Sequence, residues 1–401
     1  MSKRIPAALV LEDGRIFHGH AFGTLGETLG EAVFSTGMTG YQETLTDPSY
    51  RRQIVVSTAP QIGNTGWNRI DGESMTADPT NDAVRHGMVG KIHVAGYVIR
   101  DYAHQPCSWR LDHTLQEELE AQGIVAIQNV DTRAIVRHLR TKGSMLAGIF
   151  SGDALASDEE MLEKVRSQPP AVGQDLASEV STREMYTLDP VGEHRFTIAA
   201  IDLGIKANTP RNFVNRGLRV HMLPSSATWE QVHDLDVDGL FFSNGPGDPV
   251  TATASIALTK AALENDVPLF GICFGNQIFG RALGLDTYKM KFGHRGINIP
   301  VKDHQTGRIA ITSQNHGFAL EGEPGMEFDT PYGRALISHS CPNDNTVEGV
   351  KLLDGSAFSV QYHPEACAGP HDANYLFDEF VDLLEKHDKK GHCLLYTSDA
   401  A

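Results

Sequence analysis

The stretch Val267-Pro-Leu-Phe-Gly-Ile-Cys-Phe-Gly-Asn-Gln277 decides how the C-terminal half of this chain folds. Its first six residues form an apolar run of the kind found in a strand buried on both faces. A helix is predicted directly afterwards, over about residues 274–283, so Cys273 lies at the turn from strand to helix. Gly271 and Gly275 lie two residues on either side, where a tight turn leaves no room for side chains. This spacing is the cysteine version of the GxSxG nucleophile elbow.

An elbow of this kind would make Cys273 reactive. It places the sulfur at the carboxyl end of a sheet, where open α/β sheets bind their ligands. A helix N-terminus beneath a cysteine lowers the pKa of the thiol and favours the thiolate. The alternative is a buried structural cysteine, the usual fate of a free cysteine. We favour the nucleophile because glycines flank the residue at a strand–helix junction.

A base for this thiol is suggested by Gln361-Tyr-His-Pro-Glu365, which follows a strand predicted at 357–361. A nucleophilic thiol needs a base, and the base needs an orienting group. His363 and Glu365 are the candidates, because the carboxyl ends of parallel strands meet at one edge of a sheet. Taken singly, each residue would be interpreted as an ordinary satisfied histidine or a solvated carboxylate.

Two further segments have the composition of binding loops. Ser243-Asn-Gly-Pro-Gly-Asp-Pro249 follows a predicted strand, and its glycines let the backbone approach a ligand closely. Its backbone amides are candidates for an oxyanion or substrate cradle. Gln314-Asn-His-Gly-Phe318 is likewise polar, contains glycine and follows a strand. Without wider context, each segment would be interpreted as a plain turn.

The 401 residues are predicted to form two domains. Residues 1–150 read as a β-rich domain, with strands punctuated by glycines and one helix at 131–140. Residues 194–390 alternate short apolar strands with helices, which predicts a mostly parallel sheet covered by helices, in an α/β fold. Residues 151–193 hold ten acidic and three basic residues and are interpreted as an acidic connector, with a helix at 157–167. Residues 391–401 are interpreted as an extraneous or disordered tail.

Composition excludes several classes of function. The formal net charge of −17 argues against nucleic acid as a partner, because phosphate contacts need clustered lysine and arginine. No apolar run reaches the roughly 18–20 residues that span a bilayer, so no membrane association is expected. The five cysteines include no CxxC pair, which favours a reducing, cytoplasmic setting over disulfides or zinc. No phosphate loop, GxGxxG or HExxH motif occurs, so no metal or nucleotide site is expected on this chain.

The segments described above together resemble the triad-type (class I) glutamine amidotransferase family. The N-terminal run Phe34-Ser-Thr-Gly-Met-Thr-Gly-Tyr-Gln-Glu-Thr-Leu-Thr-Asp-Pro-Ser-Tyr50 narrows the resemblance to the small (glutaminase) subunits of carbamoyl phosphate synthase. The likeness extends over about residues 5–388. The further matching segments are Gln61–Gly66, Lys289–His294 and Pro364–Asp372.

The resemblance implies roles for individual residues. Cys273 would be the nucleophile, His363 the general base and acid, and Glu365 its orienter. The sequence departs from the common elbow GICLGHQ at Phe274 and Asn276. We expect both changes to preserve activity. Because Asn276 directly precedes a glutamine-binding residue, this substitution is a candidate for altering the affinity of the pocket for glutamine. The implied glutamine contacts are Ser49, Gly245, Gly247, Phe274, Gln277, Asn315, Gly317 and Phe318.

The resemblance also implies a reaction and a partner. The chain would hydrolyse glutamine to glutamate and ammonia through a γ-glutamyl thioester on Cys273. The ammonia would pass to a large subunit that uses ATP, Mg²⁺ and bicarbonate to make carbamoyl phosphate for arginine and pyrimidine synthesis. No cofactor is expected on this chain, and a heterodimer, with higher oligomers open, is the expected assembly. The competing functions are an amidotransferase that serves another synthase, a free-standing γ-glutamyl hydrolase, and a catalytically silent stabilising subunit.

Overall fold

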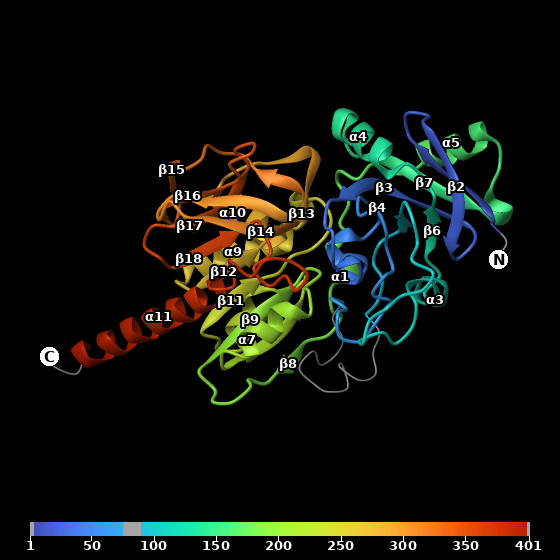
Figure 1. Cartoon of the computed structure of the whole chain (residues 1–401). Helices are drawn as coiled ribbons and strands as arrows, with labels where there is room; N and C mark the ends of the chain where they lie inside the picture. Colours follow the sequence, from blue (N-terminus) through green and yellow to red (C-terminus); the bar gives the residue numbers. More distant parts are fainter. Residues whose placement is uncertain (1–3, 75–89, 399–401) are drawn as a thin grey trace. The chain divides into compact units, whose positions relative to one another are not determined.

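A computed structural model describes residues 4–74 and 90–398, with side chains through Asp388. Its contacts divide the chain into two units. The first unit runs to Gln174 and also includes Met290–Ile297, and the second comprises Asp175–Lys289 and the chain from Asn298 onward. Figure 1 colours the first unit mainly blue to green and the second mainly green to red.

The first unit contains a closed β-barrel, which confirms the β-rich character predicted for the N-terminal domain. Neighbouring strands β4, β5 and β6 run parallel, and their alternate residues enter two different apolar clusters. A sheet with apolar residues on both faces is covered on both faces, here partly by helices. In order around the barrel, the strands are β1 (Pro6–Leu11), β2 (Ile16–Gly23), β6 (Val125–Gln128), β5 (Gly96–Val98), β4 (Gln53–Ser57), β3 (Glu27–Ser35) and β7 (Met145–Ser151).

Helix α4 (Thr132–Lys142) shows how local sequence sets an element of this unit. The carboxylate of Asp131 accepts a hydrogen bond from the Ala134 N–H at 2.9 Å and so caps the first turn of the helix predicted at 131–140. Ile135 and Leu139, one turn apart, are buried toward the barrel strands. The other helices described in this unit are α1 (Tyr41–Thr46), α3 (Leu115–Ala121) and α5 (Asp158–Arg166).

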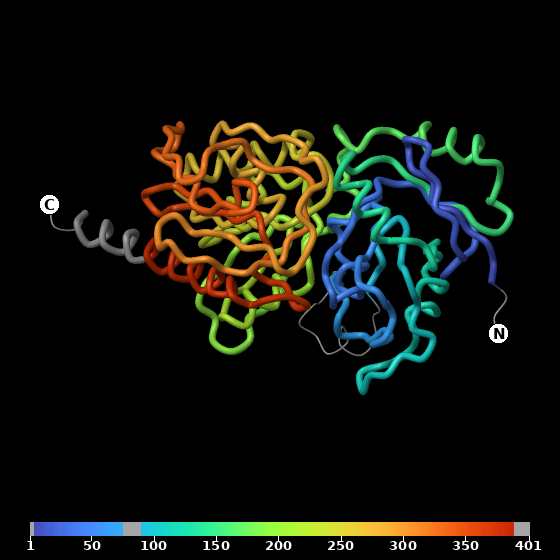
Figure 2. Tube along the Cα trace, turned by 45° about the horizontal axis from the view of Figure 1, so that its top comes forward, coloured from blue at the N-terminus to red at the C-terminus, as the bar shows by residue number. Residues whose placement is uncertain are grey.

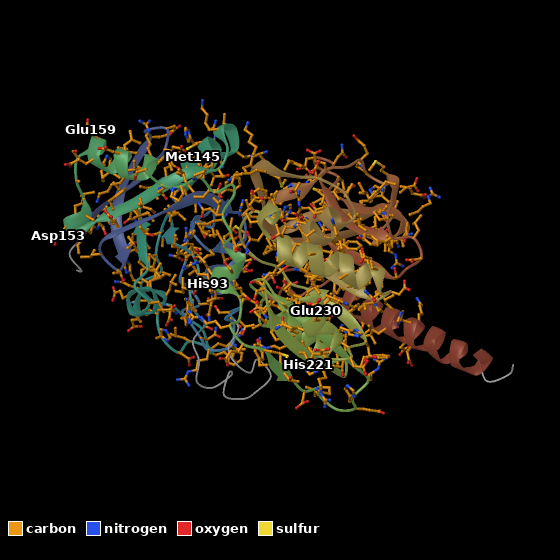
Figure 3. All side chains as sticks on the ribbon, turned by 180° about the vertical axis from the view of Figure 1, so that it is seen from behind. His93, Met145, Asp153, Glu159, His221 and Glu230 are labelled. Carbon is orange, nitrogen blue, oxygen red and sulfur yellow. The ribbon has the colours of Figure 1, made fainter. Side chains whose placement is uncertain are left out.

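The residues interpreted as a connector, 151–193, are divided between the two units. Helix α5 begins with a capping box at Ser157 and buries Met161 and Val165 against β1 and β7. Its acidic face, with Glu159, is exposed (Figure 3). Further along, β8 (Tyr186–Leu188) pairs antiparallel with a strand of the second unit. The segment therefore packs on both units through its apolar residues, because an amphipathic helix and an edge strand each bury one side.

The second unit has the predicted α/β fold, with a parallel sheet at its centre. Five adjacent strands run parallel, as the predicted alternation of short apolar strands and helices requires. In sheet order they are β10 (Leu218–Pro224), β9 (Phe196–Asp202), β11 (Gly239–Phe242), β12 (Leu269–Ile272) and β18 (Ala357–Val360). The helices described in this unit are α6 (Ala177–Val180), α7 (Asn208–Val214), α8 (Trp229–His233), α9 (Thr253–Glu264), α10 (Phe274–Ala282) and α11 (Leu376–Ser398).

An antiparallel extension of this sheet was not anticipated from the sequence. It adds long strands beyond β18, of which β13 has few fully buried residues and so lacks the apolar run that identified the central strands. The segment Gln314–Phe318, predicted as a loop after a strand, lies inside β14 instead. The added strands are β13 (Thr287–Asp303), β14 (Ile309–Leu320), β15 (Glu327–Thr330), β16 (Gly333–Ser340) and β17 (Val347–Leu352).

Strand β13 takes part in both units. Its middle residues belong to the first unit, where the Ser144 N–H donates to the Lys291 carbonyl at 2.8 Å and the Thr36 N–H to the Arg295 carbonyl at 3.2 Å. The ring of Phe292 stacks on Phe34 of β3 at 5.9 Å between centroids. The ends of the strand belong to the second unit.

The expected extraneous or disordered tail, residues 391–401, stays a prediction, although most of it is described as helix. Helix α11 continues through Ser398, and only 399–401 of the predicted tail lie outside the described residues. Figure 2 traces the first turns of this helix in red. Gly391 does not end the helix, since one interior glycine costs only about 1 kcal/mol. Within the described part of the chain, no helix is both long and apolar enough to cross a membrane.

Candidate active site

Cys273 has the backbone conformation of a nucleophile elbow. It follows β12, precedes the first residue of α10, and adopts φ 54° and ψ −98°. A positive φ is uncommon for a residue other than glycine, and such strain costs about 1–3 kcal/mol. Strained residues of this kind concentrate at functional sites, where the surrounding structure holds them in place. The strand–turn–helix context predicted for Cys273 is therefore present.

Backbone packing around the elbow explains its glycines. A Cβ added to Gly271 would lie 2.8 Å from the carbonyl oxygen of Gly275. A Cβ on Gly275 would lie 2.3 Å from the carbonyl oxygen of Phe242, at the end of β11. Neither contact can relax by rotating a side chain, because both involve backbone atoms. The first turn of α10 therefore packs directly on β11 and β12, and this close packing fixes the position of Cys273.

The strand ends bring Cys273 and His363 to the same edge of the sheet. The Cys273 N–H donates to the Val360 carbonyl at 2.8 Å, continuing the pairing of β12 with β18. Strand β14 contacts both residues: the His363 N–H donates to the Ser313 carbonyl at 2.9 Å, and the Cys273 thiol to the Asn315 carbonyl at 3.7 Å. Cys273 and His363 thus follow the adjacent strands β12 and β18, and both bond to β14, at residues two positions apart.

His363 pairs with Glu365 in the buried interior. Its Nδ1 lies 2.7 Å from Oε1 of Glu365, and neither side chain is exposed to solvent. An ionised carboxylate can only accept, so Nδ1 carries the proton and Nε2 is the basic nitrogen. Nε2 is buried and has no hydrogen-bond partner among the residues that the structure describes. A general base needs such a nitrogen, here Nε2, that is left available to take a proton from a substrate or nucleophile.

Lys206 supplies the charge that keeps Glu365 ionised. Its Nζ lies 3.2 Å from Oε1 of Glu365, and the lysine side chain is only 8% exposed. Burial alone would raise the pKa of Glu365, but Lys206 and His363 together outweigh burial and lower this pKa to about 2. The Asn208 side chain also donates to the Glu365 backbone carbonyl. Glu365 is therefore held as a carboxylate at neutral pH.

Lys206 was not predicted from the sequence, although a local signal for it exists. The segment Asp202–Lys206 follows β9 at the same edge of the sheet. The Asp202 carboxylate accepts hydrogen bonds from the N–H groups of Gly204 and Ile205, both at 2.9 Å, and so shapes this turn. Burial raises the pKa of Asp202. A polar turn after a buried parallel strand was the signal used elsewhere in the chain, and it applies here as well.

The predicted glutamine-binding glycines lie in the loop after β11. Gly247 adopts φ 98°, a conformation that favours glycine. A Cβ on Gly245 would lie 2.1 Å from the Leu203 carbonyl oxygen, so this loop packs on the turn that leads to Lys206. The Ser243 hydroxyl accepts a hydrogen bond from the Leu203 N–H at 2.9 Å and joins the two turns.

The remaining predicted contacts of the second unit surround the elbow. Phe274 is the first residue of α10, so its N–H precedes the hydrogen-bond ladder of the helix. The Gln277 side-chain amide donates to the Phe318 carbonyl at 2.9 Å and to Oε1 of Gln361 at 3.1 Å, so its NH₂ group joins the elbow to β14. Asn315, Gly317 and Phe318 all lie on β14.

Ser49 is the one predicted glutamine contact that belongs to the first unit. It lies in the short 3-10 helix Pro48–Tyr50, where its N–H donates to the Asp47 side chain at 2.9 Å. Its role in binding glutamine stays a prediction.

The departure at Asn276 lies in the core and not at a surface. The side chain is fully buried; its NH₂ group donates to Oε1 of Gln361 at 3.2 Å, and its Oδ1 accepts from the Ser359 hydroxyl at 2.9 Å. Asparagine thus satisfies its hydrogen bonds inside the protein. Phe274, the other departure, is 2% exposed and packs in the main apolar cluster of this unit.

Replacing Lys206 by methionine is expected to shift the acid limb of the pH–activity profile. In the unmodified chain Glu365 stays ionised down to about pH 2. Without Lys206 the pKa of this buried carboxyl rises, so the acid limb of kcat/KM for glutamine moves upward by about one pH unit or more. Lys260→Met, on the exposed surface of α9, is the matched control. A superimposable profile for Lys206→Met would mean that the ion pair does not set the charge of Glu365.

Comparison with known proteins assigns each half of the chain. Residues 9–149 match the family model described as "Carbamoyl-phosphate synthase small chain, CPSase domain". Residues 199–383 match the model described as "Glutamine amidotransferase class-I". The elbow and its histidine therefore lie in a class I glutamine amidotransferase domain.

Whole-chain relatives carry the assignment further. A carbamoyl phosphate synthase small chain from Mycolicibacterium paratuberculosis is 65% identical over 94% of this chain and 98% of its own length. Small chains from Mycobacterium leprae and Streptomyces coelicolor are 62% and 57% identical, over 94% and 95% of this chain and 98% and 97% of their own lengths. The chain belongs to the carbamoyl phosphate synthase small chain family. It is thus a subunit of a glutamine-hydrolysing enzyme.

Proposed function

We propose that this chain hydrolyses L-glutamine through a γ-glutamyl thioester on Cys273 and delivers the ammonia to a large carbamoyl phosphate synthase subunit. One observation carries the proposal: a strained elbow cysteine and a histidine paired with a buried carboxylate meet at adjacent strand ends. This is the arrangement that nucleophilic acyl transfer requires.

In the first half-reaction, the Cys273 thiolate attacks the side-chain carboxamide carbon of glutamine. The oxyanion that develops is stabilised by the N–H of Phe274 and by an N–H of the Gly245–Gly247 turn. His363, protonated at Nε2 by the thiol proton, donates that proton to the departing nitrogen. Ammonia leaves and the thioester remains.

In the second half-reaction, water replaces ammonia. His363 removes a proton from the water at Nε2, and the resulting hydroxide attacks the thioester carbon. The same donors stabilise the second oxyanion, the C–S bond breaks and glutamate leaves. Glu365 keeps accepting the hydrogen bond from Nδ1 throughout, because its pKa lies near 2.

The partner in this proposal is the large subunit, which would bind ATP, Mg²⁺ and bicarbonate and use the ammonia. The family name of the relatives supports a two-chain enzyme, and we propose a heterodimer that serves arginine and pyrimidine synthesis in the cytoplasm. The four cysteines whose side chains are described form no disulfide with one another, which agrees with a reducing compartment.

Co-expression with a carbamoyl phosphate synthase large subunit tests the proposal. We expect a stable complex on gel filtration and carbamoyl phosphate labelled from [amide-¹⁵N]glutamine. Complexes carrying Cys273→Ser should lose this synthesis with glutamine and retain it with added ammonia. Separate elution of the two chains, or no label transfer from glutamine, would reject the proposed partner or the proposed ammonia donor respectively.

The competing functions have less support. An amidotransferase that serves another synthase, or a free-standing hydrolase, would not need the N-terminal region that matches the small-chain model over residues 9–149. A silent subunit would not need the His363–Glu365 pair and the lysine that maintains its charge. Glutamate release by the complex would exclude a silent subunit, because a catalytically silent chain does not hydrolyse glutamine.

A further inference from the structure

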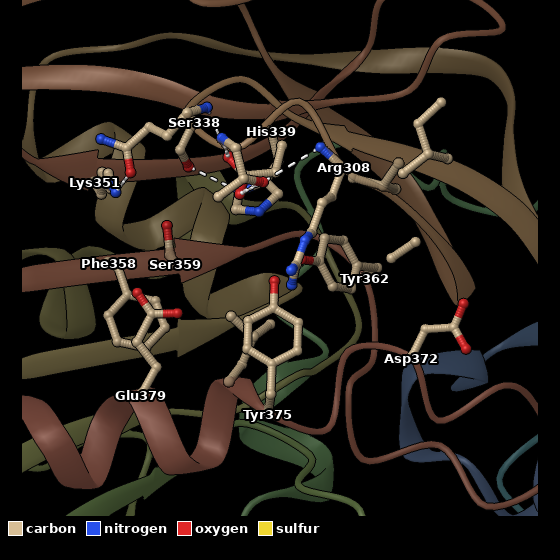
Figure 4. A pocket seen from close by; sticks show the side chains of 17 residues that line it. Arg308, Ser338, His339, Lys351, Phe358, Ser359, Tyr362, Asp372, Tyr375 and Glu379 are labelled. Carbon is tan, nitrogen blue, oxygen red and sulfur yellow. Dashed lines mark hydrogen bonds between the residues drawn. The ribbon is translucent and has the colours of Figure 1, made fainter.

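The second unit contains a cavity of about 290 Å³ that the amidotransferase reaction does not use. Its walls come from helix α11 and the segment between β18 and α11, from strands β16, β17 and β18, and from the ends of β13 and β14 with the turn between them (Figure 4). None of the predicted catalytic or glutamine-binding residues lines it. The volume lies near the lower end of the roughly 300–1,000 Å³ of ligand pockets, which limits an occupant to the size of a single metabolite.

Charged groups of both signs line this cavity, and two of them are unmatched. The Asp303 carboxylate accepts hydrogen bonds from the Thr306 hydroxyl and the Gln305 N–H, and Lys351 donates to the Gln305 side chain. In contrast, the guanidinium of Arg308 and the carboxylate of Glu379 have no hydrogen bond or ion pair to any residue that the structure describes. The Asp372 carboxylate also lines the cavity and accepts a hydrogen bond from the Ile311 N–H at 3.1 Å. Arg308 and Glu379 are thus the lining residues whose charged groups have no hydrogen-bond partner among the described residues.

Tyr375 connects these two unmatched charges. Figure 4 shows its hydroxyl directed toward the Arg308 guanidinium across the cavity. Burial raises the pKa of Tyr375; nearby Glu379 raises it further and Arg308 lowers it, so both charges lie within electrostatic range of this phenol. Burial also raises the pKa of Glu379, nearby Lys351 opposes this rise and Asp303 adds to it, so charges of both signs act on this carboxylate.

Neutral and apolar groups complete the lining. Burial lowers the pKa of His339 to about 4, so this ring is uncharged at neutral pH. Its Nδ1 lies 2.9 Å from the Ser338 hydroxyl, and its ring meets the buried Tyr362 edge-on at 5.9 Å between centroids. Phe358, which is 9% exposed, adds an apolar wall. Opposite charges separated by rings suit a ligand whose own charged groups are joined by carbon atoms.

We propose that this cavity binds a small zwitterion of the amino-acid class, with its carboxylate at Arg308 and its ammonium at Glu379. An anion without an ammonium would face the Glu379 carboxylate, and an amine without a carboxylate would face the Arg308 guanidinium. Only a molecule that carries both charges matches both groups. The cavity adjoins the catalytic strand, because Tyr362 directly precedes His363.

A panel of the free L-amino acids tests this proposal on the full-length chain. Each is added at about 10 mM, and binding is followed by saturation-transfer NMR and by calorimetry for the strongest binder. We expect at least one amino acid to bind with a Kd of about 1 mM or tighter. Its decarboxylated and deaminated analogues should each bind at least about tenfold more weakly, because each leaves one charge of the cavity unmatched.

Two variants locate the binding site. Arg308→Ala and Glu379→Gln change exposed side chains and should each weaken binding about tenfold or more. Matched controls are Arg334→Ala and Glu385→Gln, which lie outside the cavity. Binding at the glutamine site would be insensitive to all four changes. The proposal is overturned if no amino acid binds, if binding ignores Arg308 and Glu379, or if either analogue binds as tightly as the amino acid.

Discussion

Replacing Cys273 by alanine is expected to lower glutamine hydrolysis by about 10⁴-fold or more, because the thioester route then has no nucleophile. The side chain is 2% exposed and alanine removes only one atom, so the elbow and its strained backbone conformation should persist. The measurement is glutamate release at saturating glutamine, by the complex with the large subunit. Residual glutaminase activity within about tenfold of the unmodified enzyme would rule out Cys273 as the nucleophile.

Cys341 provides the matched control for this experiment. It is also buried, but burial raises the pKa of its thiol to about 12, so it should be unreactive. Cys341→Ala is therefore expected to retain glutaminase activity. In the unmodified chain, an electrophile that mimics glutamine should alkylate Cys273 first, and equal labelling of both cysteines by mass spectrometry would contradict an activated thiol at the elbow.

Replacing His363 by asparagine is expected to lower the same activity by about 10³–10⁴-fold. Both half-reactions lose their proton carrier, since no other imidazole was predicted to serve the thiol, and asparagine cannot act as a base. A thioester that does form should also decay slowly, because its hydrolysis needs a base to activate water. The measurement is steady-state glutamate release together with acid-quench detection of labelled protein.

His233→Asn is the control for that variant, since this histidine is exposed on helix α8. Its activity should match that of the unmodified chain. If His363→Asn retained most of its activity, the proton would have to be carried by another group, and the pairing of His363 with Glu365 would be structural.

Much of the site was predictable because its signals are local. A buried strand, two glycines and a cysteine within a few residues predict the elbow. Close contacts between backbone atoms require glycine at Gly271 and Gly275. His363 and Glu365 were predictable for a related reason: a short strand ends just before them, and parallel strands end at one edge. In each case, the residues that define the geometry are within a few positions of one another.

The parts that escaped prediction depend on contacts far apart in the chain. Lys206 acts on a carboxylate 159 positions away, and no spacing rule links the two residues. Strand β13 buries only residues 293–296 and Val301 out of 17 and has no regular alternation of buried and exposed residues, so its pairing partners and not its own sequence establish it. Gln314–Phe318 has the composition of a loop but lies within a strand, because hydrogen bonds to neighbouring strands override the local preference.

The course of β13 limits how this protein can be recombined or dissected. The two family-model regions, 9–149 and 199–383, suggest modules that a single junction could exchange between relatives. Yet Met290–Ile297 is encoded within the second region and packs in the first unit, where Phe292 stacks on Phe34. A chimera joined near residue 175 would pair one parent's barrel with the other parent's strand. Its barrel-facing positions, Phe292 foremost, would have to be transferred together with the N-terminal parent.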